Sequence, residues 1–246
     1  MSIKLLDDFV RLEPESHTYH DRNRTEYTSV SKFLSFFCKK FDRETISRYS
    51  AIKKGISQEE VLQEWDAIRD SSIDHGNRIH EAIERYEKTT FIRAEDEELR
   101  PLIISVTKEY SSYYRSYPEQ VLYDEENLLA GTCDKLLVHT SHKASVISIS
   151  DYKTNQSKGI EFTNKYNQYM LGPVDHLQDC NYNKYSLQLS TYAYMLQKKT
   201  GCKIGSLHIH FIPPDNMLDH HKIPVPYLKD TVIEMIKYWK STTIIK

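Results

Sequence analysis

The sequence has 246 residues, of which 39% are hydrophobic and 28% are charged, and its formal net charge is −2. This composition is too apolar for a disordered chain, and the charge does not fit a basic protein that coats nucleic acid along its whole surface. Any contact with DNA would have to come from a local basic patch or from metal ions held by acidic residues.

The N-terminal segment, MSIKLLDDFV, contains two aspartates and no long apolar run. We therefore expect neither a signal peptide nor contact with a membrane. The expected location is the cytoplasm, or the host cytoplasm if the protein is viral.

The first half of the chain has the apolar spacing of helices. The expected helices cover residues 30–37, 57–68, 73–86 and 96–115. Thr28 and Ser29 can cap the first helix, and Ser57 with Glu60 forms a capping box ahead of the second. Pro101 interrupts or starts the last one. These patterns predict a mostly helical N-terminal portion over residues 1–117.

After Pro118 the pattern changes to that of strands. The expected strands cover residues 121–126, 128–140, 145–152 and 204–212, and the expected helices cover 185–199 and 227–240. Gly201 ends the first of these helices, and Pro213 ends the last strand. The order predicts an α/β core over residues 118–246, with a mixed sheet flanked by helices, and one domain over residues 1–246.

The strongest chemical signal lies between Gly131 and Lys153. Asp151 and Lys153 alternate on one strand and therefore share a face, and Asp134 on the neighbouring strand can reach the same point. Two carboxylates and a strand carbonyl suit Mg²⁺ or Mn²⁺. The lysine can orient an attacking water or help to deprotonate it. An isolated D-x-K pattern is often simply solvated, but acids set among Leu, Val and Ile need a partner or a metal.

Four motifs resemble one enzyme family. Gly131–Asp134 followed by Asp151–Thr154 resembles the PD-(D/E)xK nuclease motif. Gln188–Tyr192 is similar to the Q-x-x-x-Y motif of the RecB-like exonuclease branch, and Gly76–His80 to its upstream G-x-x-x-H motif. Tyr27–Ser31 is similar to the mitochondrial genome maintenance exonucleases and their phage relatives. The resemblance implies a restriction-endonuclease-like fold, in which a mixed central sheet is flanked by helices.

The resemblance also implies roles for individual residues. The implied metal ligands are His80, Asp134, Asp151 and the carbonyl of Tyr152. The implied catalytic residues are Asp134, Asp151, Lys153 and Glu119. Gln188 and Tyr192 would hold the DNA backbone and brace the lysine. Alternatives remain open: His80 can be a packed helix histidine or a phosphate contact, Glu119 can be solvated, and Gln188 and Tyr192 can pack their helix on the sheet.

Three further features have alternative interpretations. Residues 164–169 interleave a charge, amides and aromatic rings, so Lys165 and Tyr166 can grip a DNA strand or belong to a plain surface loop. A basic stretch can line a DNA channel or be a solvated face: Lys39, Lys40, Arg43, Arg48, Lys53 and Lys54. The late histidines favour packing or exposure over a zinc site: His208, His210, His220 and His221.

Cysteine and glycine usage bears on cofactors. The cysteines are Cys38, Cys133, Cys180 and Cys202. They form no C-x-x-C pair and fit a reducing compartment, so we expect no iron–sulfur cluster. Neither of the glycine-rich phosphate-binding motifs, G-x-x-x-x-G-K-[S/T] and G-x-G-x-x-G, occurs, so we expect no nucleotide cofactor.

The expected function is that of a Mg²⁺- or Mn²⁺-dependent DNA exonuclease. It would hydrolyse phosphodiester bonds at DNA ends or in single strands, in DNA replication, recombination or repair. One alternative is a structure-specific or restriction-type endonuclease with the same site. Another is a catalytically silent DNA-binding module, although binding alone has no need of clustered acids. No protein partner is indicated.

Overall fold

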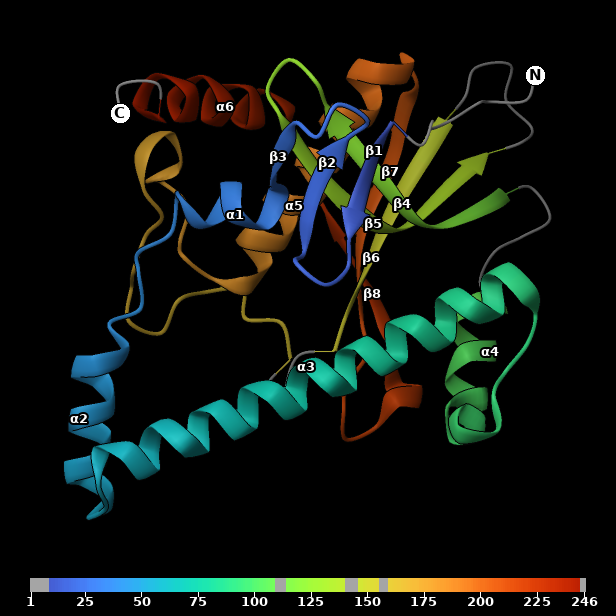
Figure 1. The fold of residues 1–246 in the computed structure, drawn as a ribbon. Coiled ribbons are helices and arrows are strands. Elements are labelled where there is room, and N and C mark those ends of the chain that lie inside the picture. The colour runs from blue at the N-terminus through green and yellow to red at the C-terminus, as the bar shows by residue number, and fades with distance from the viewer. Residues whose placement is uncertain (1–8, 109–113, 140–145, 155–158, 244–246) are drawn as a thin grey trace.

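A mixed β-sheet forms the centre of the protein, and helices cover both of its faces (Figure 1). The computed structural model describes residues 9–108, 114–139, 146–154 and 159–243. The helices are α1 (Val30–Ser35), α2 (Arg43–Lys54), α3 (Gln58–Thr89), α4 (Arg100–Lys108), α5 (Asn181–Thr200) and α6 (Lys229–Thr243), and 3₁₀ turns lie at Ala94–Leu99, Gly172–Val174 and Met217–Asp219. None of the helices in the described part of the chain combines the length and the apolarity that crossing a membrane requires.

The sheet has eight strands. They are β1 (Val10–Glu13), β2 (Thr18–Asp21), β3 (Glu26–Ser29), β4 (Tyr114–Asp124), β5 (Leu129–His139), β6 (Val146–Lys153), β7 (Lys203–Phe211) and β8 (His221–Val225). They pair in the order β1-β2-β3-β5-β6-β7-β8, and β4 pairs with β5 outside this path. The pairs β3–β5 and β6–β7 are parallel, and the other pairs are antiparallel. The expected mixed sheet with flanking helices and a helical N-terminal portion is confirmed.

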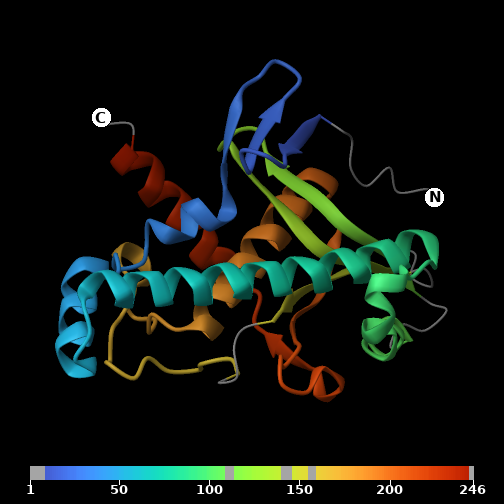
Figure 2. The same cartoon turned by 60° about the horizontal axis from the view of Figure 1, so that its bottom comes forward.

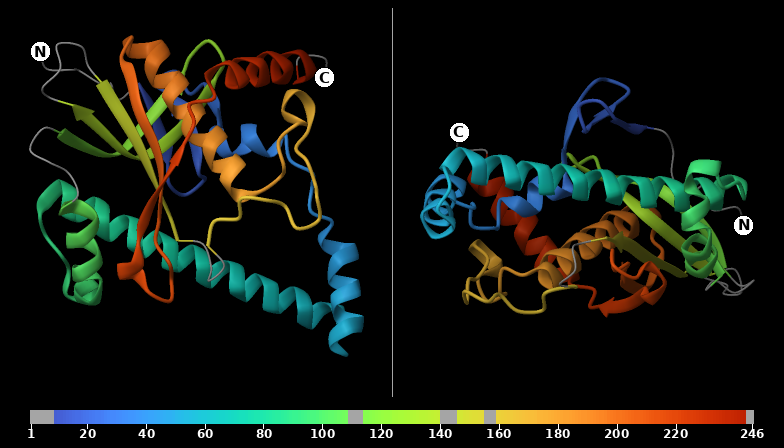
Figure 3. Two further views of the ribbon diagram at one scale, coloured as in Figure 1. Left: turned by 180° about the vertical axis from the view of Figure 1, so that it is seen from behind. Right: turned by 90° about the horizontal axis from the view of Figure 1, so that it is seen from below.

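Two apolar layers hold the helices on the sheet. α1, α5 and α6 share one buried cluster with the sheet, which includes Phe33, Leu189 and Met235. α3 and α4 share another, in which Ile83 packs near Tyr152 of β6. Because successive residues of a strand point to opposite faces, Tyr152 faces α3 while Lys153 faces α5. The end of β6 therefore contacts helices of both layers, which lie on opposite sides of the sheet (Figure 3).

Local signals at helix ends are confirmed. The side chain of Ser29 accepts the N–H of Lys32 at 3.1 Å and caps α1. Ser57 and Glu60 form the expected capping box of α3. α5 ends at Gly201, whose φ of +66° is in the left-handed region that glycine tolerates.

The helices expected over 57–68 and 73–86 form one helix, α3. Its middle, residues 67–74, is exposed apart from the half-buried Ser72, and Ile68 and Ile73 are each 51% exposed. α3 runs from α2, which packs on its N-terminal end, to the sheet, and most side chains in its middle face solvent (Figures 1 and 2).

Other boundaries differ from the sequence predictions. The helix expected over 96–115 ends at Lys108, residues 109–113 lie outside the described residues, and β4 already begins at Tyr114. Thr140 and Ser145, expected at strand ends, also lie outside the described residues. α5 begins at Asn181, earlier than expected.

Four strands were not predicted. β1, β2, β3 and β8 have only four or five residues each, too few for alternation to be recognised. β8 also contains Pro224, which is tolerated because β8 is an edge strand.

Gly131 lets α5 pack closely on β5. A Cβ at this position would lie 2.7 Å from Cε1 of Tyr192 and 3.1 Å from Cγ2 of Val30. We expect Gly131→Ala to lower the free energy of unfolding by roughly 1–3 kcal/mol, because the tyrosine must move out of a packed layer. Urea denaturation checks this. Tyr192→Leu removes the clashing atom, so the alanine should cost less in that background, and equal costs in both backgrounds would contradict the clash.

Candidate metal centre

A break in strand pairing creates a gap beside β5. β4 pairs with one edge of β5 from Leu129 to His139. On the other edge β3 pairs only with Leu129 and Ala130, and β6 pairs only from Lys135 onward. Within the described residues, no strand pairs with residues 131–134 on that edge. Backbone groups in this gap need other partners.

Side chains supply those partners. The N–H of Thr132 donates to Oη of Tyr19 at 2.9 Å. The N–H of Tyr152 donates to Oδ2 of Asp134 at 2.6 Å. The carboxylate of Asp134 therefore joins β5 to β6 where their ladder ends.

At the same point, the side chains of β5 stop alternating regularly between the two faces of the sheet. Cys133 and Leu136 are three residues apart, yet both enter the cluster under α5. A regular strand, with its period of two, would place them on opposite faces. The irregularity coincides with Glu119 on β4, which lies between the paired residues Pro118 and Gln120 and has a φ of +49°. This bulge-like bend lets both Asp134 and the next residue reach α3.

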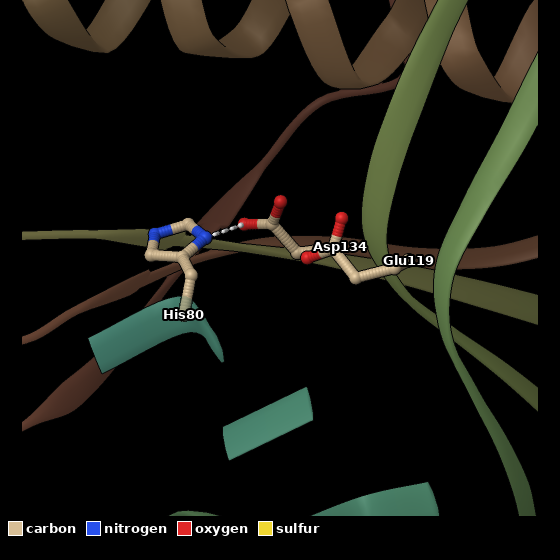
Figure 4. A group of neighbouring side chains, drawn as sticks. All are labelled: His80, Glu119 and Asp134. Carbon is tan, nitrogen blue, oxygen red and sulfur yellow. Dashed lines mark ion pairs between the residues drawn. The ribbon is translucent and has the colours of Figure 1, made fainter. Parts of the chain in front are cut away.

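His80 completes a group of possible metal ligands. Its Nδ1 lies 3.5 Å from Oδ2 of Asp134. Nitrogen or oxygen atoms of His80, Glu119 and Asp134 all lie within 4.8 Å of one another. Figure 4 shows His80 pointing from α3 toward the two carboxylates on the strands. His80 comes 54 positions before Asp134 in the sequence. The packing of α3 on the sheet is what brings it to Asp134 and Glu119.

Gly76 allows this approach of α3. A Cβ at Gly76 would lie 3.0 Å from Oγ1 of Thr154, just beyond the end of β6. One helical turn later, His80 faces Asp134. The spacing G-x-x-x-H therefore places the glycine and the histidine on the face of α3 that approaches the sheet.

Asp151 and Lys153 lie together at the end of β6, as the alternation of strand residues predicted. The Asp151 side chain is buried and forms an ion pair with Nζ of Lys153. That Nζ also lies 4.7 Å from the ring centroid of Tyr185 on α5. Burial lowers the pKa of Lys153, but the carboxylates of Asp151 and Asp134 outweigh burial and hold it above its usual range. The lysine is an ammonium ion in this arrangement.

Burial and mutual repulsion raise the pKa of two carboxyl groups. For Asp134, burial and the charge of Asp151 raise the pKa to about 6. For Glu119, burial and the charges of Asp134 and Glu84 raise the pKa to about 8. A divalent cation would relieve this repulsion. The donor set, one imidazole and several carboxylate oxygens, fits Mn²⁺ or Mg²⁺.

The carbonyl of Tyr152 also lies toward the gap. The N–H and C=O of one strand residue point to the same edge. The N–H of Tyr152 points to Asp134. The C=O of the next residue, Lys153, bonds to the N–H of Ile212 on the other side. The Tyr152 carbonyl therefore faces the candidate ligands.

Gln188 and Tyr192 lie on the face of α5 that packs on the sheet. Nε2 of Gln188 donates to Oη of Tyr192 at 3.0 Å. Tyr192 is buried and covers Gly131, whereas Gln188 is half-buried. Tyr192 packs α5 on the sheet. Its hydrogen bond with Gln188 holds the side-chain amide of Gln188 close to the core.

Lys165 and Tyr166 lie on an exposed turn. Nζ of Lys165 lies 5.0 Å from the ring centroid of Tyr166, and both residues are exposed. Asn164 stabilises the turn, because its Oδ1 accepts the N–H of Tyr166 at 2.8 Å and its Nδ2 donates to the carbonyl of Asp179 at 2.6 Å.

Two of the late histidines, His210 and His220, form a hydrogen-bonded chain with Ser105. Nε2 of His210 lies 2.9 Å from Nδ1 of His220, and Nε2 of His220 lies 2.8 Å from Oγ of Ser105. Burial and nearby positive charge, including His220 when protonated, lower the pKa of His210 to about 3. Among the described residues, the only three-ligand group is the one at Asp134.

Sequence reasoning did not single out two neighbours of the site. Tyr185 contacts Lys153, and it lies three residues before Gln188 on α5. Glu84 acts electrostatically on Glu119, and it lies one turn after His80 on α3. Helical spacing from the motif residues was the signal that could have identified both.

Comparisons with known proteins give distant likenesses. No protein-family model matches the sequence, and no curated protein matches it. The chain is similar to the crystal structure of SSO0001, with 12% identity and a TM-score of 0.36, covering 89% of this chain and 75% of the other. It is also similar to a protein from Eubacterium rectale named "Putative exonuclease", with 14% identity and a TM-score of 0.41, covering 89% and 80%. Both likenesses are too distant to carry an argument about this chain.

The raised pKa values predict how stability depends on pH. In the folded metal-free protein, Asp134 holds a proton up to about pH 6 and Glu119 up to about pH 8, whereas the unfolded chain releases both from about pH 4 upward. The free energy of unfolding should therefore fall as pH rises through this window. Glu119→Gln should flatten the decrease between about pH 5 and pH 8. Urea denaturation in the presence of a chelator measures both slopes.

Glu15→Gln changes an exposed carboxyl group away from the gap and is the control. It should keep the wild-type slope. Identical slopes for wild type and Glu119→Gln would show that Glu119 does not titrate as an elevated group.

Proposed function

We propose that this chain is a divalent-metal-dependent deoxyribonuclease. The observation that carries the proposal is the group of His80, Glu119 and Asp134 at the gap beside β5, with the Asp151–Lys153 ion pair near enough to act electrostatically on Asp134. These side chains come from β4, β5, β6 and α3. A site that only binds DNA has no use for clustered acids facing a phosphate, whereas metal-assisted hydrolysis requires them.

The metal ligands would be His80, Asp134, Asp151 and the carbonyl of Tyr152. A bound Mg²⁺ or Mn²⁺ would supply an acidified water and offset negative charge on the phosphate. The ligands are already organised, because Asp134 is held by the Tyr152 N–H. Organised ligands reduce the reorganisation needed when the substrate arrives.

Lys153 and Glu119 would act on the reacting groups. Lys153 is held as an ammonium ion by its carboxylate neighbours, so it would place positive charge beside the phosphate and would not act as a base. Glu119 is half-buried at the same point, and once a bound cation offsets the repulsion that raises its pKa, its carboxylate would accept the proton of the attacking water. Gln188, fixed through Tyr192, would contact the DNA backbone.

We further propose the RecB-like exonuclease mode, in which DNA ends or single strands are the substrate in replication, recombination or repair. The exposed middle of α3 supports this, because its solvent-facing side chains are accessible to a strand that approaches His80 on the same helix. Lys39, Lys40 and Lys53 are exposed on the segment that leads through α2 into α3. Lys165 and Tyr166 would grip the strand by charge and stacking.

Substitution at the core of the site tests the enzymatic proposal. Asp134→Ala should remove metal-dependent cleavage, with a loss of at least about 10³-fold, because a ligand and a gap-bridging acceptor are lost together. Lys153→Ala should reduce cleavage by about 10²-fold or more. Cleavage of end-labelled DNA with Mg²⁺ or Mn²⁺, and with a chelator, is the measurement.

Circular dichroism should confirm that both variants fold, and Lys237→Ala, which changes an exposed residue of α6, is a control that leaves the site unchanged. Full activity in either site variant would overturn the assignment. If the wild-type protein binds DNA but never cleaves it with any divalent cation, the chain is a binding module.

Circular single-stranded DNA distinguishes the exonuclease from the endonuclease. We expect linear single strands to be degraded while circles of the same sequence persist, because the circle offers no end. A digestion time course on both substrates, resolved by gel electrophoresis, measures the difference. Rapid cleavage of the circle would establish an endonuclease with the same site.

A further inference from the structure

A fully buried lysine follows Asp134 directly. The side chain of Lys135 has 0% exposure, and its Nζ forms an ion pair with Glu87 of α3. The same Nζ lies 3.1 Å from Oη of Tyr152. A buried charge is costly unless it is paired and hydrogen-bonded, so this lysine fixes β5, β6 and α3 to one another.

Tyr152 connects this ion pair to the candidate metal ligands. Its backbone N–H donates to Asp134 at 2.6 Å. Its ring meets the imidazole of His80 edge-on, with centroids 5.9 Å apart and planes at 84°. A shift of the tyrosine ring would therefore move the surroundings of both ligands.

Glu87 ties the same network to α3. It lies seven residues, about two helical turns, after His80, so the two side chains share one face of the helix. His80 meets Asp134 and Glu87 meets Lys135, the next residue on β5. The Lys135–Glu87 pair thus sets the rotation of α3 that brings His80 to the site.

We propose that Lys135 and Glu87 are positioning residues of the metal centre and act through Tyr152 and α3. This role rests on the proposed function, because it concerns the same site. Neither residue touches the substrate. Their role is to hold Asp134, His80 and the Tyr152 carbonyl in the geometry that binds a divalent cation.

The competing interpretation is a purely structural ion pair. Removal of one partner would leave a buried charge and risk unfolding. We therefore choose the double variant Lys135→Met/Glu87→Gln, which removes both charges, and Tyr152→Phe, which removes only the hydroxyl. Each is compared with the wild-type protein by calorimetric titration of Mn²⁺ without DNA, alongside a thermal melt.

The matched control is Lys198→Met/Asp124→Asn. Nζ of Lys198 pairs with buried Asp124 at 2.8 Å and joins α5 to β4. Neither residue contacts the metal-ligand group. We expect both double variants to melt at a lower temperature than the wild-type protein. A loss of stability alone would therefore not explain a difference in Mn²⁺ affinity between them.

The expected result is a roughly ten-fold weaker Mn²⁺ affinity for Lys135→Met/Glu87→Gln, a smaller loss for Tyr152→Phe, and wild-type affinity for the control. Wild-type affinity in both test variants would overturn the positioning role and leave the nuclease proposal intact. Mn²⁺ binding with the expected losses, but no DNA cleavage by the wild type, would refute the nuclease and support the positioning role. A wild-type protein that binds no Mn²⁺ would overturn both.

Discussion

The gap in strand pairing beside β5 is the constraint on which the site depends. β3 and β6 share one edge of β5 and leave residues 131–134 without a neighbouring strand. Buried backbone groups must still be hydrogen-bonded, and here side chains take the place of a strand. Tyr19 accepts from Thr132, and Asp134 accepts from Tyr152. An aspartate that folding itself requires is thus held at a place where other acids and a cation can reach it.

Charge around this gap is distributed between two layers. On the α5 side, Lys153 pairs with Asp151 and lies under the ring of Tyr185. On the α3 side, Lys135 pairs with Glu87. Asp134 and Glu119 lie near Asp151, and they are the carboxyl groups among the described residues whose pKa values rise. The unrelieved repulsion is therefore concentrated where a divalent cation would be most stabilising, at some cost to the stability of the metal-free protein.

The sequence predicted those features of the site and fold that depend on residues near one another in the chain. Strand alternation predicted that Asp151 and Lys153 meet, and capping signals predicted the starts of α1 and α3. The face change at Asp134 depends on the positive φ of Glu119, a non-glycine residue with no sequence signature for it. The contacts of Lys135 with Glu87, 48 residues away, and of Thr132 with Tyr19, 113 residues away, are set by packing. No periodicity encodes such pairs.

One face of α3 shows what the short G-x-x-x-H motif does in the structure. Gly76, His80 and Glu87 recur at intervals of four and seven residues, so they lie on one face of the helix. The glycine allows close approach to Thr154, the histidine meets Asp134, and the glutamate meets Lys135. Each contact fixes the rotation and depth of the helix for the others. A helix whose middle is exposed can place His80 accurately because these contacts anchor its C-terminal half against the sheet.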